Sequence, residues 1–300
     1  MGVRLSSLIP PLFPRALGID LGSRSIKVLE LERRGGTRLV RGLVVHPMPE
    51  GALQGGTVNP EGVVPALAEA LRRLGSSTRT AAMAVSGNPV FTKRVQLPPM
   101  DEEELEEVLP EEAQQYLPFP LEEVTLDAQV LRVDPERMEV LLIAAKRNLV
   151  SAYLEVARGA GVRLKVLDVD TFALSNAFEV NYPELRPSLV TLVDLGARAT
   201  RVVLLREGAV LFTREVEAGR ESAAEVKRTV EFFATSSGER PERCLVCGGG
   251  VQREVLEEME ALLETPVEAL NPFRRVRNPH PELEGAAHLA VVALGLALRA

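Results

Sequence analysis

The feature that most constrains this chain is an internal repeat built around the tripeptide Asp-x-Gly. An apolar segment leads into Asp20-Leu-Gly22, and an alternating segment then runs to a hairpin turn at Arg33-Arg-Gly-Gly. The same pattern returns 174 residues later, where Asp194-Leu-Gly196 follows an apolar segment and a second hairpin turns at Arg206-Glu-Gly208. Self-similarity of this kind indicates a duplicated unit. We therefore expect two related α/β domains, for which 300 residues is an ordinary length.

Between the two copies, periodicity predicts a mixture of helices and strands. We expect helices over 63–74, 101–116 and 147–160, and strands over 80–86, 90–97, 124–132, 138–144 and 164–170. From residue 90 onward these elements follow the order βαββαβ. We therefore expect residues 90–165 to form a subdomain inserted into the first repeat.

The second copy is followed by fewer elements. We expect one helix over 222–235, a strand over 243–247, a helix over 253–263, a short strand over 267–269 and an apolar helix over 285–298. The resulting division is a flexible leader over 1–14, a first domain over 15–89 plus 166–188 plus 285–300, the inserted subdomain, and a second domain over 189–284.

The two Asp-x-Gly turns predict a phosphate site. Glycine after a strand allows backbone amides to approach phosphate oxygens, and the aspartate can hold a water bound to Mg²⁺. Facing each other across a cleft, Asp20 and Asp194 would bracket a Mg-nucleotide, although a single such turn is usually an ordinary turn. The candidate nucleotide-binding residues are Asp20, Gly22, Ser23, Arg24, Ser25, Lys27, Asp194, Gly196, Ala197, Arg198, Thr200, Gly248, Gly249 and Gly250, with no catalytic residue among them.

The third glycine turn and the cysteines before it each allow two interpretations. Gly248-Gly-Gly250 can let a base or ribose lie on bare backbone, or it can be a plain tight turn into the next helix. Cys244 and Cys247 have the spacing of a zinc or redox pair, but the three histidines have no ligand spacing that would complete a zinc site. We therefore expect both cysteines to pack in a core strand, without a disulfide.

Charge and hydropathy exclude two classes of partner. The net charge of −7 disfavours a general electrostatic grip on nucleic acid. No run of 18 apolar residues is present, and the leader is broken by prolines, unlike a secretory signal. We expect a cytoplasmic protein without a membrane span.

Several longer segments resemble a known family. With the two Asp-x-Gly turns, they resemble the actin-like ATPase superfamily and, within it, the PilM family of type IV pilus assembly proteins, over about residues 16–300. The segments that carry the closer resemblance are Asp20–Leu31, Thr92–Met100, Glu111–Val124, Asp168–Phe178, Val193–Ala197 and Leu270–Phe273.

The resemblance implies a fold and a role. The fold would consist of duplicated actin-like (ribonuclease H-like) domains with ATP and Mg²⁺ in the cleft between them. The role would be a cytoplasmic scaffold, peripheral to the inner membrane, that binds the N-terminal peptide of a PilN-like inner-membrane protein beside the inserted subdomain. Other components of the pilus machinery would be further partners.

The chain also departs from that family. Residues 218–242 leave room for little more than one helix, where family members carry several tens of residues more, and Arg24 and Arg198 stand in turns that commonly hold small polar residues. An arginine can bind phosphate, or it can fill a site that is no longer used. We therefore expect nucleotide binding to be weakened or lost, and ATPase activity to be weak or absent.

Other interpretations stay open from sequence. A phosphotransferase of the sugar-kinase branch would need a catalytic aspartate and a sugar pocket, neither of which can be identified. A cell-division scaffold like FtsA shares the architecture but normally ends in an amphipathic helix. The acidic run 101–112 is either a docking surface or ordinary helix-start chemistry, and Leu117-Pro-Phe-Pro120 is either an exposed anchor or a packed helix end.

Overall fold

The computed structural model describes residues 13–54, 56–87, 89–219 and 221–300. Most of the expected leader over 1–14 therefore lies outside the described residues. The described residues form two five-stranded sheets, a three-stranded sheet and a short two-stranded ribbon, β4 (Leu53–Gln54) with β5 (Thr57–Val58).

The first sheet has the strand order β10-β6-β1-β2-β3. Strands β1, β2 and β3 form an antiparallel meander, whereas β6 lies parallel to β1 and β10 lies parallel to β6. The bounds are β1 (Arg15–Leu21), β2 (Ser25–Arg34), β3 (Thr37–Pro47), β6 (Thr80–Val85) and β10 (Arg163–Val169).

The second sheet repeats this topology with the order β13-β12-β11-β14-β15. Its meander is antiparallel and its last two strands are again added in parallel. The expected duplication is thus confirmed at the level of sheet topology. The bounds are β11 (Val190–Leu195), β12 (Ala199–Arg206), β13 (Ala209–Glu217), β14 (Arg243–Cys247) and β15 (Val267–Ala269).

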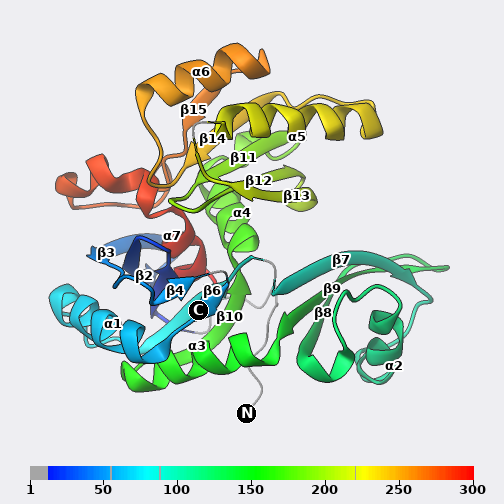
Figure 1. Cartoon of the computed structure of the whole chain (residues 1–300), viewed down its shortest axis with the longest axis horizontal. Coiled ribbons are helices and arrows are strands. Elements are labelled where there is room, and N and C mark those ends of the chain that lie inside the picture. Colours follow the sequence, from blue (N-terminus) through cyan, green and yellow to red (C-terminus); the bar gives the residue numbers. More distant parts are fainter. Residues whose placement is uncertain (1–12, 55, 88, 220) are drawn as a thin grey trace.

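Helices cover both faces of each sheet (Figure 1). α1 and α3 pack on the outer face of the first sheet, and α5 and α6 pack on the outer face of the second. α7 and α4 lie between the two sheets, α7 mainly against the first and α4 against the second. The bounds are α1 (Pro60–Leu74), α3 (Arg147–Gly159), α4 (Asp170–Asn181), α5 (Ser222–Ser237), α6 (Arg253–Leu263) and α7 (Val291–Ala297).

The inserted block contains the three-stranded sheet, which extends away from the two domains in Figure 1. Its order is β7-β9-β8, and α2 packs on one face through Leu105, Leu109 and Ala113. A capping box between Asp101 and Glu104 fixes the start of α2. The bounds are β7 (Val90–Leu97), α2 (Glu102–Gln114), β8 (Val124–Val133) and β9 (Met138–Lys146).

The element order of residues 90–165 is βαββαβ, as expected, but the last helix and strand pack elsewhere. β10 pairs with β6 in the first sheet, and α3 places Leu149, Tyr153 and Val156 in the core of the first domain. The three-stranded subdomain therefore covers residues 90–146. Sequence periodicity gives the type of an element but not the sheet that it joins, which explains the difference.

Two further elements differ from the expectations. α4 was not expected from its sequence. Apolar residues of the helix, such as Ala173, Leu174 and Phe178, lie on several of its sides, so the segment shows little amphipathic contrast. The helix expected over 285–298 is divided into the 3-10 segment Pro281–Leu289 and α7. The tighter winding places the carbonyl of His288 where the Gly248 amide donates to it at 2.9 Å.

The described part of the chain contains no helix that is long and apolar enough to cross a membrane. Cys244 and Cys247 both lie buried in the core strand β14, where we expected them to pack. Short 3-10 turns at Leu121–Glu123 and Pro183–Leu185 complete the fold.

Candidate functional site

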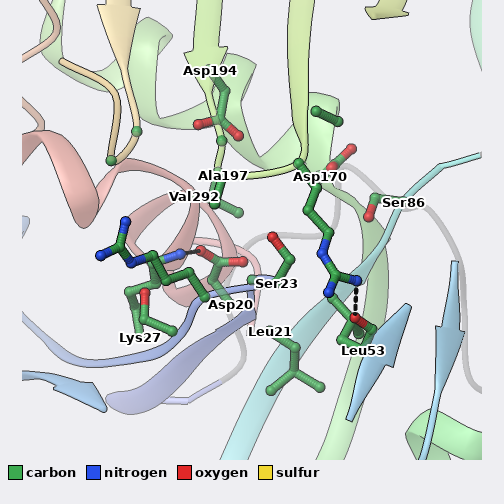
Figure 2. A pocket seen from close by; sticks show the side chains of 18 of the residues that line it. Asp20, Leu21, Ser23, Lys27, Leu53, Ser86, Asp170, Asp194, Ala197 and Val292 are labelled. Atoms are coloured by element: carbon green, nitrogen blue, oxygen red, sulfur yellow. Dashed lines mark hydrogen bonds and ion pairs between the residues drawn. The ribbon is translucent and has the colours of Figure 1, made fainter. Parts of the chain in front are cut away.

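A cleft of about 1010 Å³ lies between the two domains and is lined by residues of both sheets. Every candidate residue except Thr200 lines this cleft. Figure 2 shows Asp194 on one wall and Asp20 and Ser23 on the opposite wall, directed toward the same space. The structure therefore brings the two Asp-x-Gly turns together as the duplicated pattern predicts.

Thr200 occupies a different position from the one expected. It is buried, and its hydroxyl contacts the Ser222 hydroxyl at 3.2 Å. Successive residues of a strand point to opposite faces, so Thr200 points into the core and Arg201 points into the cleft.

The first Asp-x-Gly turn joins β1 to β2 and places Lys27 beside Asp20. Asp20 lies directly opposite Lys27 in the ladder, and the Lys27 Nζ lies 2.9 Å from the Asp20 Oδ2. A Cβ at Gly22 would stand 2.6 Å from that Nζ and 3.0 Å from the Ser25 carbonyl oxygen, so a larger residue would displace the lysine head from its present position. The Gly22 amide donates to the Ser25 carbonyl at 3.1 Å and closes the turn.

The Asp20–Lys27 ion pair is largely shielded from water, with side-chain exposures of 19% and 15%. Burial alone would lower the pKa of Lys27, but the neighbouring Asp20 carboxylate outweighs burial and raises it. Lys27 is therefore a permanent cation at this end of the cleft.

The second turn repeats the arrangement with an arginine. Asp194 lies directly opposite Arg201 in the β11–β12 ladder, and the Arg201 Nη1 donates to the Asp194 Oδ2 at 3.2 Å. Gly196 closes the turn by donating to the Ala199 carbonyl at 3.0 Å, and a Cβ there would stand 2.6 Å from that oxygen.

Arg201 is the centre of a larger cluster. Its Nε lies 2.6 Å from the Asp170 Oδ2 and 3.1 Å from the Glu215 Oε2, and its Nη2 donates to the Ser86 Oγ at 3.3 Å. Burial would lower the pKa of Arg201, but Asp170 and then Asp194 more than offset burial and raise it. The guanidinium stays charged at every working pH.

Asp170 stands at the first position of α4 and faces the same cluster. Burial raises the pKa of Asp170 to about 7, against the opposing effect of Arg201, and the charges of Asp194 and Glu215 raise it further. The sequence analysis assigned neither Asp170 nor Arg201 to the site. The repeat offset of 174 residues, which aligns Arg201 with Lys27, is the signal that could have identified Arg201.

The third loop, Gly248–Gly250, packs closely on the second turn. A Cβ at Gly248 would stand 2.4 Å from the Asp194 Oδ1, and its φ of +92° favours glycine. The amides of Gly248 and Gly250 donate to the carbonyls of His288 and Leu195, both at 2.9 Å. Two of the three amides therefore serve the fold, which supports the tight-turn interpretation.

One contact crosses the mouth of the cleft. The Arg198 Nη1 in the second turn donates to the Leu53 carbonyl of β4 at 2.9 Å, and Figure 2 shows this bond near Leu53. Arg198 thereby links the second domain to the first.

A magnesium ion does not fit the acidic groups of this cleft well. The carboxylates of Asp20 and Asp194 are already neutralised by Lys27 and Arg201, and the Cys247 Sγ lies 3.9 Å from the other Asp194 oxygen. Among the described residues, no group of three His, Cys, Asp or Glu side chains is arranged to hold a metal ion. The expectation that Asp20 and Asp194 hold hydrated Mg²⁺ is thus not supported by their surroundings.

A smaller groove of about 290 Å³ adjoins the cleft at the base of the inserted subdomain. Its lining includes the apolar residues Val90, Phe91 and Phe119, which belong to the subdomain. It also includes the charged residues Asp170, Arg201, Arg214 and Glu215. Cleft and groove therefore share the Arg201 cluster.

Comparison with solved structures gives the same architecture. The chain is similar to a structure described as the PilM-PilN type IV pilus biogenesis complex, with 28% identity, a TM-score of 0.87, and coverage of 96% of this chain and 99% of that one. It also shares its fold with the ethanolamine utilization protein EutJ from Carboxydothermus hydrogenoformans, at 18% identity and a TM-score of 0.52 over 97% of this chain and 91% of that one. The cytoplasmic domain of EpsL from the type II secretion system of Vibrio cholerae matches at 14% identity and a TM-score of 0.54, over 91% and 92%.

The family comparison agrees with the sequence resemblance. The family described as type IV pilus assembly protein PilM matches residues 18–224, which include both Asp-x-Gly turns and the whole inserted block. This chain belongs to the PilM family of type IV pilus assembly proteins.

Proposed function

We propose that this chain is a cytoplasmic scaffold of type IV pilus assembly that binds the N-terminal peptide of a PilN-like inner-membrane protein. The observation that carries the proposal is the groove where the inserted subdomain meets the two main domains. The similar PilM-PilN complex supports the choice of partner. Through that peptide the scaffold would lie peripheral to the inner membrane and contact other pilus components.

The groove has the size and chemistry for a short extended peptide. Its volume of about 290 Å³ accommodates a few side chains rather than a folded domain. Phe91 and Phe119 offer a pocket for an apolar side chain, while Glu215 and Arg214 offer charged partners for polar ones.

The apolar end is held in place before any peptide arrives. The Lys146 Nζ lies 4.7 Å from the centre of the Phe119 ring, and the same ammonium lies 3.6 Å from the Glu123 Oε2. Because the ring is already positioned, binding costs less side-chain entropy. The Leu117-Pro-Phe-Pro120 segment thus serves as an anchor for a partner as well as the end of α2.

We also propose that the cleft between the two domains binds a nucleotide with reduced affinity. Between β13 and β14 the described chain contains a single helix, α5. We infer that little protein is left to cover a nucleotide base placed against Gly248–Gly250. Loss of one wall for a stacked base would forfeit about 1–3 kcal/mol of binding free energy. We infer weak nucleotide binding and little or no ATPase activity, since an open cleft cannot hold an attacking water in line.

The peptide proposal is tested by fluorescence anisotropy with a labelled N-terminal peptide of the PilN-type partner. Phe119→Ala should weaken binding by at least about tenfold, corresponding to roughly 1.4 kcal/mol. The matched control is Phe232→Ala on α5, an aromatic residue that is 61% exposed and does not line the groove. Equal affinity of wild type and Phe119→Ala, or equal losses in both variants, would reject the groove as the binding site.

A further inference from the structure

Among the described residues, four lysine and arginine side chains line the cleft in two equivalent pairs. Lys27 and Arg201 stand opposite Asp20 and Asp194 at equivalent positions of the two repeats. Arg24 and Arg198 are likewise equivalent, and both are exposed in the turns that line the cleft. The duplication has therefore placed one inner and one outer cation on each wall.

The inner pair neutralises the aspartates. Lys27 Nζ and Arg201 Nη1 lie 2.9 Å and 3.2 Å from their carboxylates, and Arg201 is 21% exposed. A magnesium ion would need these carboxylate oxygens either as direct ligands at about 2.1 Å or as acceptors for the waters that it carries. The metal ion would thus have to share Asp20 with Lys27 and Asp194 with Arg201. The repulsion between the metal ion and these two cations is poorly screened in a partly buried cleft.

The outer pair has no carboxylate partner in the described part of the chain. Within the described residues, neither Arg24 nor Arg198 forms an ion pair with a carboxylate, and the side chain of Arg198 contacts the neutral Leu53 carbonyl instead. Guanidinium groups match phosphate oxygens with two parallel hydrogen bonds. One such group stands in each of the two turns that line the cleft, and we call Arg24 and Arg198 the clamp; Ser23 and Ser25 of the first turn add hydroxyl donors.

We propose that this cleft binds a phosphate compound without a divalent cation, with Arg24 and Arg198 gripping the phosphates and with Lys27 and Arg201 taking the place of the metal. The ligand class is a linear polyphosphate, either the tail of a nucleotide or free inorganic polyphosphate. The volume of about 1010 Å³ accommodates either one. The inference rests on the proposed phosphate cleft and is independent of peptide binding in the groove.

The test is calorimetric titration of the full chain with ATP at fixed ionic strength, once with excess EDTA and once with excess Mg²⁺. We expect a dissociation constant in EDTA that is equal to or lower than the one in Mg²⁺. Binding that requires Mg²⁺, or no binding in either condition, overturns the proposal. A third titration with tripolyphosphate in EDTA identifies the source: equal affinity favours free polyphosphate, and weaker affinity favours a nucleotide.

Variants at the two exposed arginines test the clamp. Arg24→Ser combined with Arg198→Ser should weaken metal-free binding on the order of 10- to 100-fold. The matched control combines Arg72→Ser and Arg253→Ser, whose side chains are 74% and 86% exposed on α1 and α6 and do not line the cleft. A comparable loss in the control pair, or none in the cleft pair, contradicts the assignment.

The role of Arg201 is tested by a change in metal preference. In Arg201→Gln, Asp194 loses its cation, so ATP should bind more tightly with Mn²⁺ than with EDTA, whereas Arg201→Lys should keep the metal-independent behaviour. Equal metal dependence in wild type and a folded Arg201→Gln contradicts this role. If Arg201→Gln does not fold, the metal dependence of the wild type and the clamp variants decide the proposal.

Discussion

Gly248 connects the third loop with the second Asp-x-Gly turn. Its φ of +92° is unfavourable for any other residue, and a Cβ at this position would lie only 2.4 Å from the Asp194 Oδ1. Both observations exclude a larger residue. Gly248→Ala should lower the free energy of unfolding by about 1–3 kcal/mol, since the new methyl group would displace a carboxylate from its partners. Urea denaturation at pH 7 measures the change.

Gly249 provides the control for that substitution. A Cβ there would meet only the Leu289 Cδ2 within 4 Å, at the ordinary contact distance of 3.9 Å. Gly249→Ala should therefore change stability by no more than about 0.5 kcal/mol. If both variants shifted the urea midpoint equally, close packing on Asp194 would not be the cause.

Asp168 predicts a specific dependence of stability on pH. It is fully buried 3.3 Å from the Arg299 Nε, and burial raises its pKa to about 6, an effect that Arg299 only partly offsets. Because the folded pKa exceeds the unfolded value of 3.8, the folded state binds the proton more tightly. This contribution is fully present below about pH 4 and is lost as pH rises through about 6.

Asp168→Asn should abolish that contribution. The difference in unfolding free energy between wild type and variant should change by about 2–3 kcal/mol between pH 4 and pH 7, which thermal or urea denaturation across this range measures. Glu136→Gln, at an exposed position, is the control and should show no such trend. A difference that is constant with pH would mean that Asp168 titrates normally.

At the residue scale, the sequence predicted the position of the cleft better than its electrostatics. The glycines and aspartates were identifiable because a turn after a strand needs those residue types. Asp170 was not, because nothing local indicates that the start of α4 reaches the second turn, whereas the alignment of Arg201 with Lys27 in the repeat could have identified Arg201. The assignment of Thr200 failed because alternation along β12 directs it away from the cleft.

At the element scale, strand and helix positions followed from periodicity, but membership of a sheet did not. β7 was expected at the residues where it occurs, and α5 and α6 lie close to their expected ranges. In contrast, α3 and β10 were expected in the inserted subdomain and pack in the first domain. Pairing with β6 depends on contacts between residues far apart in sequence, which a local pattern does not encode.

This boundary predicts how the inserted subdomain can be removed. Val90 pairs with Ala145, and the Lys146 amide donates to the Pro89 carbonyl at 3.0 Å, so the two ends of the subdomain lie side by side. Replacing residues 91–144 with a short Gly-Ser linker should leave a folded protein that no longer binds the partner peptide. Circular dichroism and the anisotropy titration check the two outcomes.

The longer excision provides the contrast. Removing residues 90–165 also removes α3 and β10, including Tyr153 and Val156 of the first core, and should leave an unfolded protein. A folded 90–165 deletion would contradict the assignment of α3 and β10 to the first domain. Peptide binding by the folded 91–144 deletion would instead contradict the groove.

At the scale of the whole molecule, the layers run from α1 and α3 through the first sheet, α7 and α4, and the second sheet to α5 and α6 (Figure 1). The Arg201 cluster joins these layers at one point. Ser86 follows the first sheet, Asp170 begins α4, and Asp194 and Glu215 belong to the second sheet. One guanidinium thus contacts both domains and the helix between them.

Arg201→Met should therefore destabilise the whole protein rather than one domain. Removing one partner of a buried ion cluster leaves unpaired carboxylates, which typically costs about 3–5 kcal/mol. Asp170→Asn in the Arg201→Met background should restore part of this loss, because it removes one of the carboxylates left without a cation. Urea denaturation at pH 8 measures both steps, and calorimetry shows whether the domains still unfold together. We expect a single unfolding transition in the wild type and separate transitions of the two domains in Arg201→Met, because the variant loses the contact that couples them. If Arg201→Met were as stable as the wild type, the cluster would contribute no net stability.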